Sequence, residues 1–147
     1  KPHKKIEILF TIGEELYVKG SDVFDYSKVT AKQAYVLDLS EETTFNIGTI
    51  QGGTATNIVP DCCVLTAYET TLESKSVTDF QKACEILGFS GGLTGTFGGS
   101  DNNSFAKNGI EGLVLSNGMY NAHSTREYTT VDDLYKGAEL IGQLILL

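Results

Sequence analysis

Residues 6–20 of the chain, IEILFTIGEELYVKG, join an apolar run to a glycine and two adjacent glutamates. The run from Ile6 to Ile12 is rich in β-branched and aromatic side chains, which predicts a buried strand. Gly13 lets the chain leave the sheet, so Glu14 and Glu15 are expected at the carboxyl end of that strand. In open α/β sheets this is the edge where ligands and catalytic groups collect.

The Glu14–Glu15 pair has two interpretations. Two carboxylates in a partly desolvated site repel each other, so they need a cation or a shared proton. A metal ligand beside a general base meets this need, because the metal neutralises one charge while the other carboxylate stays free to take a proton. A solvated acidic turn is the alternative, and by frequency alone it is the commoner one.

Two further polar residues are expected at strand exits. Ala34–Leu37 (AYVL) predicts a second buried strand ended by Asp38, and Gly112–Ser116 (GLVLS) predicts another whose following loop carries His123. The carboxyl ends of parallel strands lie along one edge, where these residues can meet Glu14–Glu15. Carboxylate oxygens and an imidazole nitrogen are zinc-type ligands. Taken singly, each has a plainer explanation, Asp38 as a turn cap and His123 as an ordinary loop histidine.

Two amphipathic helices complete the α/β pattern. Ser76 and Asp79 form a capping pair at the start of a helix that ends at Gly88. Thr130 caps a second helix near the carboxyl terminus. The predicted buried stripe of this second helix is Val131, Leu134, Ala138, Ile141 and Ile145.

The alternation of strands and helices predicts a three-layer α/β/α sandwich with a mainly parallel sheet. Residues 20–31 are expected to form a loop or a short helix. Phe45–Ile50 and Cys63–Tyr68 predict two strands around a glycine-rich turn, which indicates a small antiparallel α+β fragment over residues 41–74.

Composition narrows the possible partners. The chain has 147 residues, 41% of them hydrophobic and 20% charged, which suits one ordinary globular core. Its net charge of −8 argues against nucleic acid or an anionic membrane as a partner. No apolar run approaches the roughly 20 residues that span a bilayer. Three cysteines make no disulfide framework and no signal peptide is recognisable, so we expect a cytoplasmic location.

Five segments together resemble the M20 metallopeptidases, and most closely the peptidase T-like tripeptidases. They are ILFTIGEELYVKGS, YVLDLS, NIGTIQGGTATNIVPD, GGSDNNSFAKNGI and NAHSTREYTTVDDL, and they cover most of the chain. The resemblance implies an aminopeptidase or carboxypeptidase that acts on short peptides. It also implies two divalent metal ions, zinc with cobalt or manganese as alternatives, and a homodimer formed through an inserted lid domain.

The resemblance also implies roles for individual residues. Glu14 matches the general base, and Glu15 matches a metal ligand. Asp38 matches a ligand of the second metal, and His123 matches a ligand of the metal that Glu15 binds. The residues matching substrate contacts are Asn57, Gly98 and Gly99.

The sequence departs from the family pattern in two ways. The upstream His-x-Asp pair and the bridging aspartate of the family have no match in these residues. Asp38 and His123 are 85 positions apart, which is too few for a complete lid domain between them. We therefore expect the carboxyl-terminal part of a catalytic domain (residues 1–40 and 75–147) with a lid fragment (41–74), and no activity from these 147 residues alone.

The sequence has features of two other functional classes. A nucleotide-binding module is suggested by the glycines at 91, 92, 95, 98 and 99, but no G-x-G-x-x-G or P-loop spacing occurs there. A non-catalytic M20-like interaction domain stays open, because the missing ligands would leave a site that holds two metals poorly. Metal analysis of the purified protein separates this reading from the enzymatic one.

Overall fold

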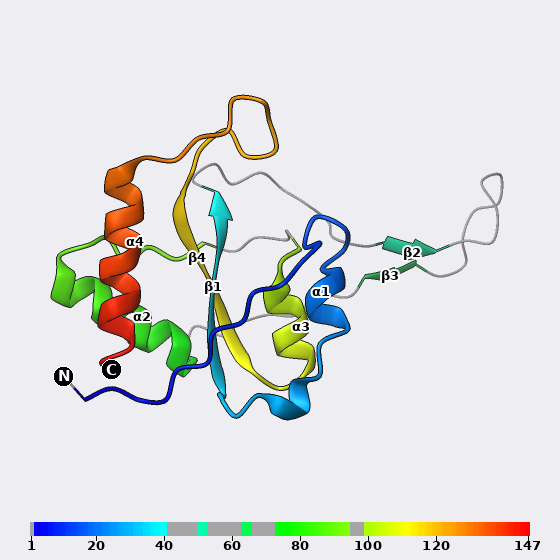
Figure 1. Ribbon diagram of the computed structural model, residues 1–147, viewed down its shortest axis with the longest axis horizontal. Helices are drawn as coiled ribbons and strands as arrows, with labels where there is room; N and C mark the ends of the chain where they lie inside the picture. Colours follow the sequence, from blue (N-terminus) through cyan, green and yellow to red (C-terminus); the bar gives the residue numbers. More distant parts are fainter. Residues whose placement is uncertain (1, 41–49, 53–62, 66–72, 95–98) are drawn as a thin grey trace.

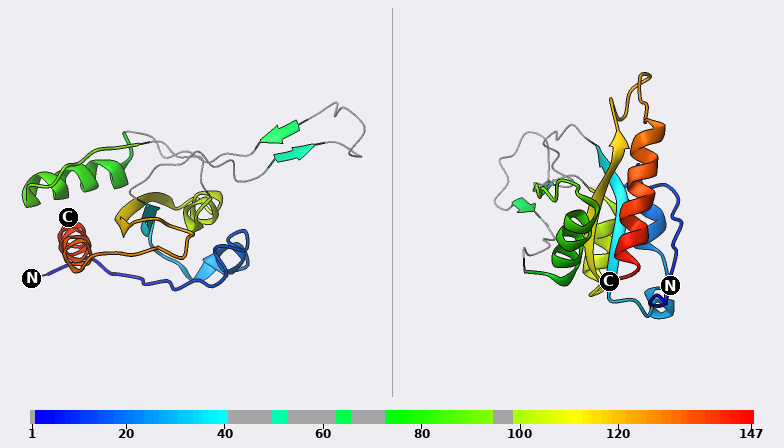
Figure 2. Two further views of the ribbon diagram at one scale, coloured as in Figure 1. Left: turned by 90° about the horizontal axis from the view of Figure 1, so that it is seen from above. Right: turned by 90° about the vertical axis from the view of Figure 1, so that its left-hand side faces the viewer.

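The computed structural model describes residues 2–40, 50–52, 63–65, 73–94 and 99–147, and it shows a mixed α/β protein (Figure 1). Strands β1 (Gln33–Ser40) and β4 (Glu111–Met119) form a parallel pair. Helices α2 and α4 lie to one side of this pair and α1 and α3 to the other (Figures 1 and 2). The helices are α1 (Lys19–Asp22), α2 (Lys75–Leu87), α3 (Asp101–Lys107) and α4 (Val131–Leu144), with a 3-10 turn at Tyr26–Lys28.

A second, antiparallel pair consists of β2 (Ile50–Gly52) and β3 (Cys63–Leu65). Both strands fall within or beside the two strands predicted for the lid fragment. Residues 41–49, 53–62 and 66–72 of that fragment lie outside the described part of the chain. The parallel β1–β4 pair agrees with the predicted α/β class. The three-layer sandwich and the division into catalytic and lid segments stay predictions.

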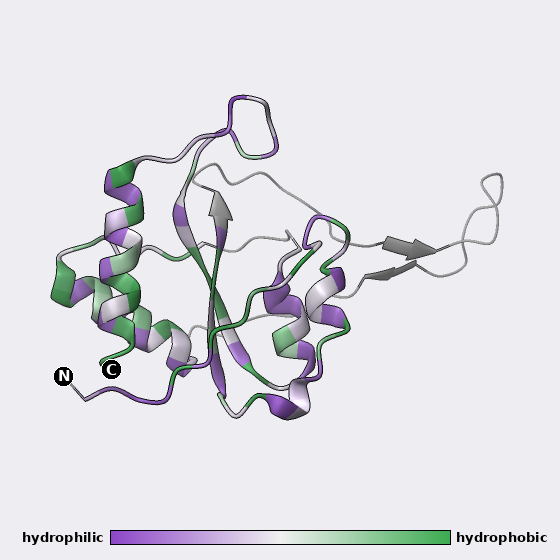
Figure 3. Ribbon diagram, in the orientation of Figure 1, coloured by the Kyte–Doolittle hydropathy of each residue, from purple (hydrophilic) through white to green (hydrophobic). Residues whose placement is uncertain are grey.

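The hydrophobic core lies where α2 and α4 pack on β4. Its buried members are Ala83, Cys84, Leu115, Leu140 and Leu144. Apolar and polar stretches alternate along both helices, as expected for elements with one face in this core (Figure 3). Among the residues that the structure describes, every helix is too short or too polar to cross a bilayer.

Helix α2 begins two residues earlier than predicted. The side chain of Ser74, not that of Ser76, accepts a hydrogen bond from the N–H of Val77 and caps the helix. Ser76 is instead buried, and its N–H donates to the carboxylate of Glu111 on β4. The predicted end is confirmed, because Gly88 takes the left-handed conformation (φ 71°) at the C-cap.

Helix α4 has the predicted cap but only part of the predicted buried stripe. Ile141 packs against the core, whereas Val131, Leu134 and Ala138 are exposed. Thr130 accepts a hydrogen bond from the N–H of Asp133, as expected. The predicted stripe is wrong at its start, because the side chain of Val131 is 82% exposed. The Asp133 side chain accepts a hydrogen bond from Tyr120 and lies against Gly118, so this side of the helix faces β4. Leu140 and Leu144, seven and eleven positions after Asp133, are therefore the buried residues.

The predicted strand at Ile6–Ile12 is also wrong. These residues are in no strand, and Figure 1 shows the segment crossing the β1–β4 pair instead of running alongside it. Exposure alternates as in an extended chain, but most of the apolar side chains are on the exposed side: Ile8, Phe10 and Ile12 are 76%, 90% and 82% exposed, whereas Leu9 is half-buried. A strand needs a neighbour for its N–H and C=O groups, and none of the described strands offers one to this segment. Glu7 instead fastens it, by accepting hydrogen bonds from the N–H groups of Thr30 and Ala31.

Candidate metal and catalytic site

The Glu14–Glu15 turn has a strained backbone. Gly13 takes a positive φ of 67°, and Tyr17 (φ 63°) and Val18 (φ 50°) do so as well. A β-branched residue such as Val18 is seldom found in this conformation, and each such residue costs on the order of 1–3 kcal/mol. Such a turn persists only where its surroundings hold it.

The two ends of this turn are in backbone contact. A Cβ atom added at Gly20 would lie 2.4 Å from the carbonyl oxygen of Ile12. The N–H of Val18 donates to the carbonyl of Glu14 at 2.8 Å, and the N–H of Leu16 to that of Gly13 at 3.1 Å. The carboxylates therefore sit on a closed loop, with its neck at Ile12 and Gly20.

The loop that carries His123 is also closed at its base. Tyr120 and Tyr128 stack with ring centroids 4.9 Å apart, and each donates its N–H to the carbonyl of the other. His123 itself has a positive φ of 63°, and its N–H donates to the carboxylate of Glu127 at 2.8 Å. These contacts fix where the loop presents its imidazole.

The structure brings Glu15 and His123 together. The Nε2 atom of His123 lies 3.2 Å from the Oε1 atom of Glu15, and both side chains are about 70% exposed. The two residues are 108 positions apart in the sequence and come from different loops. Their contact is the one direct link among the four predicted catalytic and metal residues in the described part of the chain.

Asp38 lies inside a strand, not at its end. Strand β1 continues to Ser40, whereas the sequence predicted that it would stop at Leu37. Leu37 pairs with Leu115 and Leu39 with Ser116, so Asp38 is an extra residue on β1. Such a bulge changes the direction of the side chain at that point.

The acidic side chains lie within electrostatic reach of one another. The pKa of Glu14 is raised, first by desolvation and then by the charges of Asp38 and Glu15. The pKa of Asp38 is raised by desolvation first, then by the charges of Asp101 and Glu15. In both cases His123 acts in the opposite direction. A bound cation would relieve this repulsion.

The residues present fit a divalent cation in part. Glu15 and His123 offer an oxygen and a nitrogen 3.2 Å apart, which is a zinc-type donor pair. The described residues contain no group of three such side chains in ligating geometry, so Asp38 is not gathered with the other two. The described residues thus bring two such donors into contact, with Asp38 close enough for its pKa to respond to both.

Of the predicted substrate residues, Asn57 and Gly98 lie outside the described part of the chain. Gly99 is described and exposed, and it directly precedes Ser100, the N-cap of α3. Their substrate roles stay predictions.

The sequence reasoning missed helix α3 and its first residue, Asp101. The charge of Asp101 raises the pKa of both Glu14 and Asp38, so it belongs to the acidic group. A signal was present in the sequence: Ser100 is a good N-cap residue, and Asn108–Gly109 is a stop signal that begins eight residues later. The surrounding glycines made the segment look like a loop.

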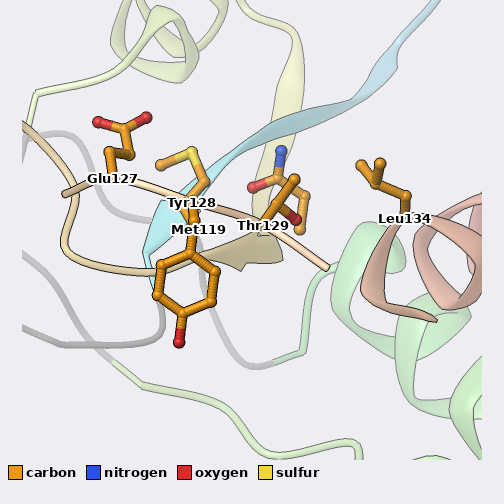
Figure 4. A pocket seen from close by; sticks show the side chains of 6 residues that line it. Met119, Glu127, Tyr128, Thr129 and Leu134 are labelled. Atoms are coloured by element: carbon orange, nitrogen blue, oxygen red, sulfur yellow. The ribbon is translucent and has the colours of Figure 1, made fainter. Parts of the chain in front are cut away.

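A shallow hollow of about 300 Å3 lies beside the His123 loop, where β4 meets the start of α4 (Figure 4). It is lined by Asn117, Met119, Glu127, Tyr128, Thr129 and Leu134. Glu127 links it to His123 through the hydrogen bond described above.

The structure is thus a mixed α/β protein in which Glu15 contacts His123 beside the acidic residues Glu14, Asp38 and Asp101. Residues 10–85 match the M20 peptidase dimerisation domain, and since this is just over half of the 147 residues, the chain belongs to that family.

Solved structures of two peptidases have a similar fold. Aminopeptidase PepT from Bacillus cereus matches 92% of this chain with a TM-score of 0.72 and 21% identity. A tripeptidase from Staphylococcus aureus matches the same share with a TM-score of 0.72 and 18% identity. In each case the match covers 62% of the other protein. This likeness fits the resemblance to peptidase T-like proteins.

A curated relative, the uncharacterised protein YqjE of Bacillus subtilis, is 23% identical over 239 residues. The match takes in 97% of this chain and 64% of the relative. The aligned stretch is longer than the chain's 147 residues, so parts of the relative within it have no counterpart here. The chain therefore spans less than two thirds of the length of the relatives it matches.

Proposed function

We propose that this chain belongs to a metal-dependent exopeptidase of the peptidase T type, which hydrolyses short peptides. The observation that carries the proposal is the contact of Glu15 with His123 beside Glu14, whose pKa is raised. Membership of the M20 family supports it, as do the names of the two structural neighbours, an aminopeptidase and a tripeptidase.

The proposed metal ligands are Glu15, His123 and Asp38. The cofactor would be two divalent ions, zinc by preference with cobalt or manganese as alternatives, with Asp38 serving the second. When bound, such ions lower the pKa of water toward neutrality and polarise a carbonyl group.

Glu14 is the proposed general base. It takes a proton from the water that attacks the peptide carbonyl and returns that proton to the leaving amine. Desolvation and its acidic neighbours raise its pKa, which brings the carboxylate closer to the proton affinity that this task needs. Asn57, Gly98 and Gly99 are the proposed substrate contacts.

Other features of the intact protein follow the same resemblance. We propose a three-layer α/β/α catalytic domain, a homodimer formed through residues 41–74 and their continuation, and a cytoplasmic location. Membership of a dimerisation-domain family supports the homodimer. A non-catalytic M20-like interaction domain is the alternative, favoured by the absence of a three-ligand group among the described residues.

The test is Glu14→Gln in the full-length protein. Glutamine keeps the shape but cannot accept a proton, so hydrolysis of a tripeptide should fall on the order of 100- to 10,000-fold while zinc content stays unchanged. Glu139→Gln, an exposed position on α4, is the matched control and should leave the rate unaltered. A wild-type protein that takes up no divalent metal and cleaves no peptide would instead support the interaction domain.

A further inference from the structure

One face of helix α3 contacts the chain on both sides of the Glu14–Glu15 turn. Before the turn, the Thr11 hydroxyl donates a hydrogen bond to the Asp101 carboxylate. After it, the hydroxyls of Ser21 and Ser104 are hydrogen-bonded at 3.1 Å. Asp101 and Ser104 are three positions apart and therefore share one helix face.

We propose that Asp101 and Ser104 are positioning residues that hold the two ends of this turn, and so keep Glu14 and Glu15 in place. The inference deepens the proposed function, because it rests on the role given there to the two glutamates. Neither α3 residue is assigned a contact with substrate or metal.

These contacts hold a strained backbone that would otherwise relax. The Ser21 hydroxyl also lies 3.0 Å from the carbonyl of Val18, one of the two residues with positive φ beside Glu15. Ser104 is thus linked through the Ser21 hydroxyl to Val18, a residue with a strained backbone. Strain of about 1–3 kcal/mol per residue relaxes unless such neighbours prevent it.

Burial supports the same conclusion. Ser21 is fully buried, Ser104 is 3% exposed and Asp101 is 9% exposed. The second carboxylate oxygen of Asp101 has no hydrogen-bond partner among the described residues, which is a costly arrangement for a buried polar group. A residue kept for helix stability alone would not need to be buried in this way, since an acid in the first turn is equally favourable when exposed.

A third contact on α3 contributes little to holding the turn. Lys107 and Asp22 form an ion pair at 3.0 Å, but both side chains are more than half exposed. Exposed pairs of this kind contribute little, because water and salt screen them.

The experiment compares Thr11→Val with Thr11→Ser in the full-length protein. Valine has the shape of threonine without the hydroxyl, whereas serine keeps the hydroxyl. Amide hydrogen exchange of residues 13–18 and the affinity for zinc are the two measurements. In Thr11→Val we expect exchange about 10- to 100-fold faster and zinc binding at least tenfold weaker, since a hydrogen bond to a charged group is lost. Thr11→Ser should restore wild-type values.

Asp132→Asn is the matched control, because Asp132 is also an acid in the first turn of a helix, but on α4. It should change neither measurement. Equal exchange and equal zinc affinity in Thr11→Val and Thr11→Ser would overturn the proposal. If Thr11→Val loses its near-UV circular dichroism, Ser104→Ala takes its place, and wild-type exchange in that variant would overturn the proposal equally.

The two proposals fail in different ways. Faster exchange in Thr11→Val without any zinc binding in the wild type would uphold the positioning role and refute the metal site. If Thr11→Val binds zinc as tightly as the wild type and its amides exchange at the wild-type rate, the metal site is upheld and the positioning role is refuted.

Discussion

Glu7 shows how much one side chain does in a segment that forms no strand. Its two oxygens accept hydrogen bonds from the N–H groups of Thr30 and Ala31, the Thr30 hydroxyl and the Lys5 ammonium. These donors, with Lys5 the largest cause, lower the pKa of Glu7 from 4.5 to about 2. A side-chain carboxylate thus replaces the backbone ladder that the sequence had predicted here.

The protein should therefore lose the stabilising contribution of Glu7 as the solution becomes acidic. A lowered pKa in the folded state stabilises the fold fully above about pH 4.5, and this contribution is lost as pH falls toward about 2. Glu7→Gln should remove that part of the pH dependence of the unfolding free energy, measured by urea denaturation from pH 2 to 7. Glu85→Gln, exposed on α2, is the control. Parallel curves for Glu7→Gln and wild type would contradict the expectation.

Gly20 closes the neck of the Glu14–Glu15 loop. Gly20→Ala places a methyl group 2.4 Å from the Ile12 carbonyl oxygen, so the backbone must shift, at a cost of roughly 1–3 kcal/mol of unfolding free energy. Gly142→Ala on α4 meets nothing within 4 Å and should stabilise the helix by up to about 1 kcal/mol. Chemical denaturation distinguishes the two, and a neutral Gly20→Ala would show that the neck is not tight.

At the scale of elements, α4 shows why periodicity alone misplaced a buried face. Its sequence offers apolar residues on more than one side, and the contacts of Asp133 with Gly118 and Tyr120 select one of them. Such contacts join residues from different elements, so no pattern within the helix contains them. Its cap at Thr130 was predictable because the cap is a local hydrogen bond.

The selected face makes a quantitative prediction. Leu144→Ala removes a buried side chain from the α2–α4 core and should cost about 2–5 kcal/mol of unfolding free energy. Leu134→Ala, on the face that the sequence had favoured, should cost less than about 0.5 kcal/mol, because that side chain is 53% exposed. Equal losses in urea denaturation would mean that both faces are covered in solution.

For the molecule as a whole, the α/β class and the parallel β1–β4 pair could be predicted because buried strands and amphipathic helices have distinct periods. Glu15 and His123 lie in contact as predicted, but not for the predicted reason, because the strand expected before Glu15 does not form. Asp38 lies inside β1 and is not gathered with them. The position of Asp101 near Glu14 and Asp38 could not be predicted, because Asp101 begins a short helix that follows a glycine-rich segment and packs against residues distant in sequence. The failure at Ile6–Ile12 has a similar cause: an apolar run states a preference for burial, but the neighbours decide whether a strand forms.

Metal binding should stabilise the whole molecule. At a zinc concentration 100 times the dissociation constant, the full-length protein should gain about 2.7 kcal/mol of unfolding free energy, seen as a higher melting temperature that a chelator reverses. His123→Ala should lose most of this gain, whereas His3→Ala should keep it, because His3 is exposed and its ring nitrogen contacts the carbonyl of Lys4. A zinc-induced shift of equal size in both variants would exclude His123 as a ligand.

The bulge at Asp38 makes the β1–β4 ladder irregular, but it also provides a carboxylate near the other acidic side chains. Leu37 and Leu39 already pair with consecutive residues of β4, so deleting the residue between them would make the ladder regular at this point and would also remove a carboxylate from the cluster. In a library selected for thermal tolerance alone, we expect this position to drift toward deletion or toward β-branched residues. Selection for catalysis should hold it as aspartate, so the residues recovered there would report which pressure had acted.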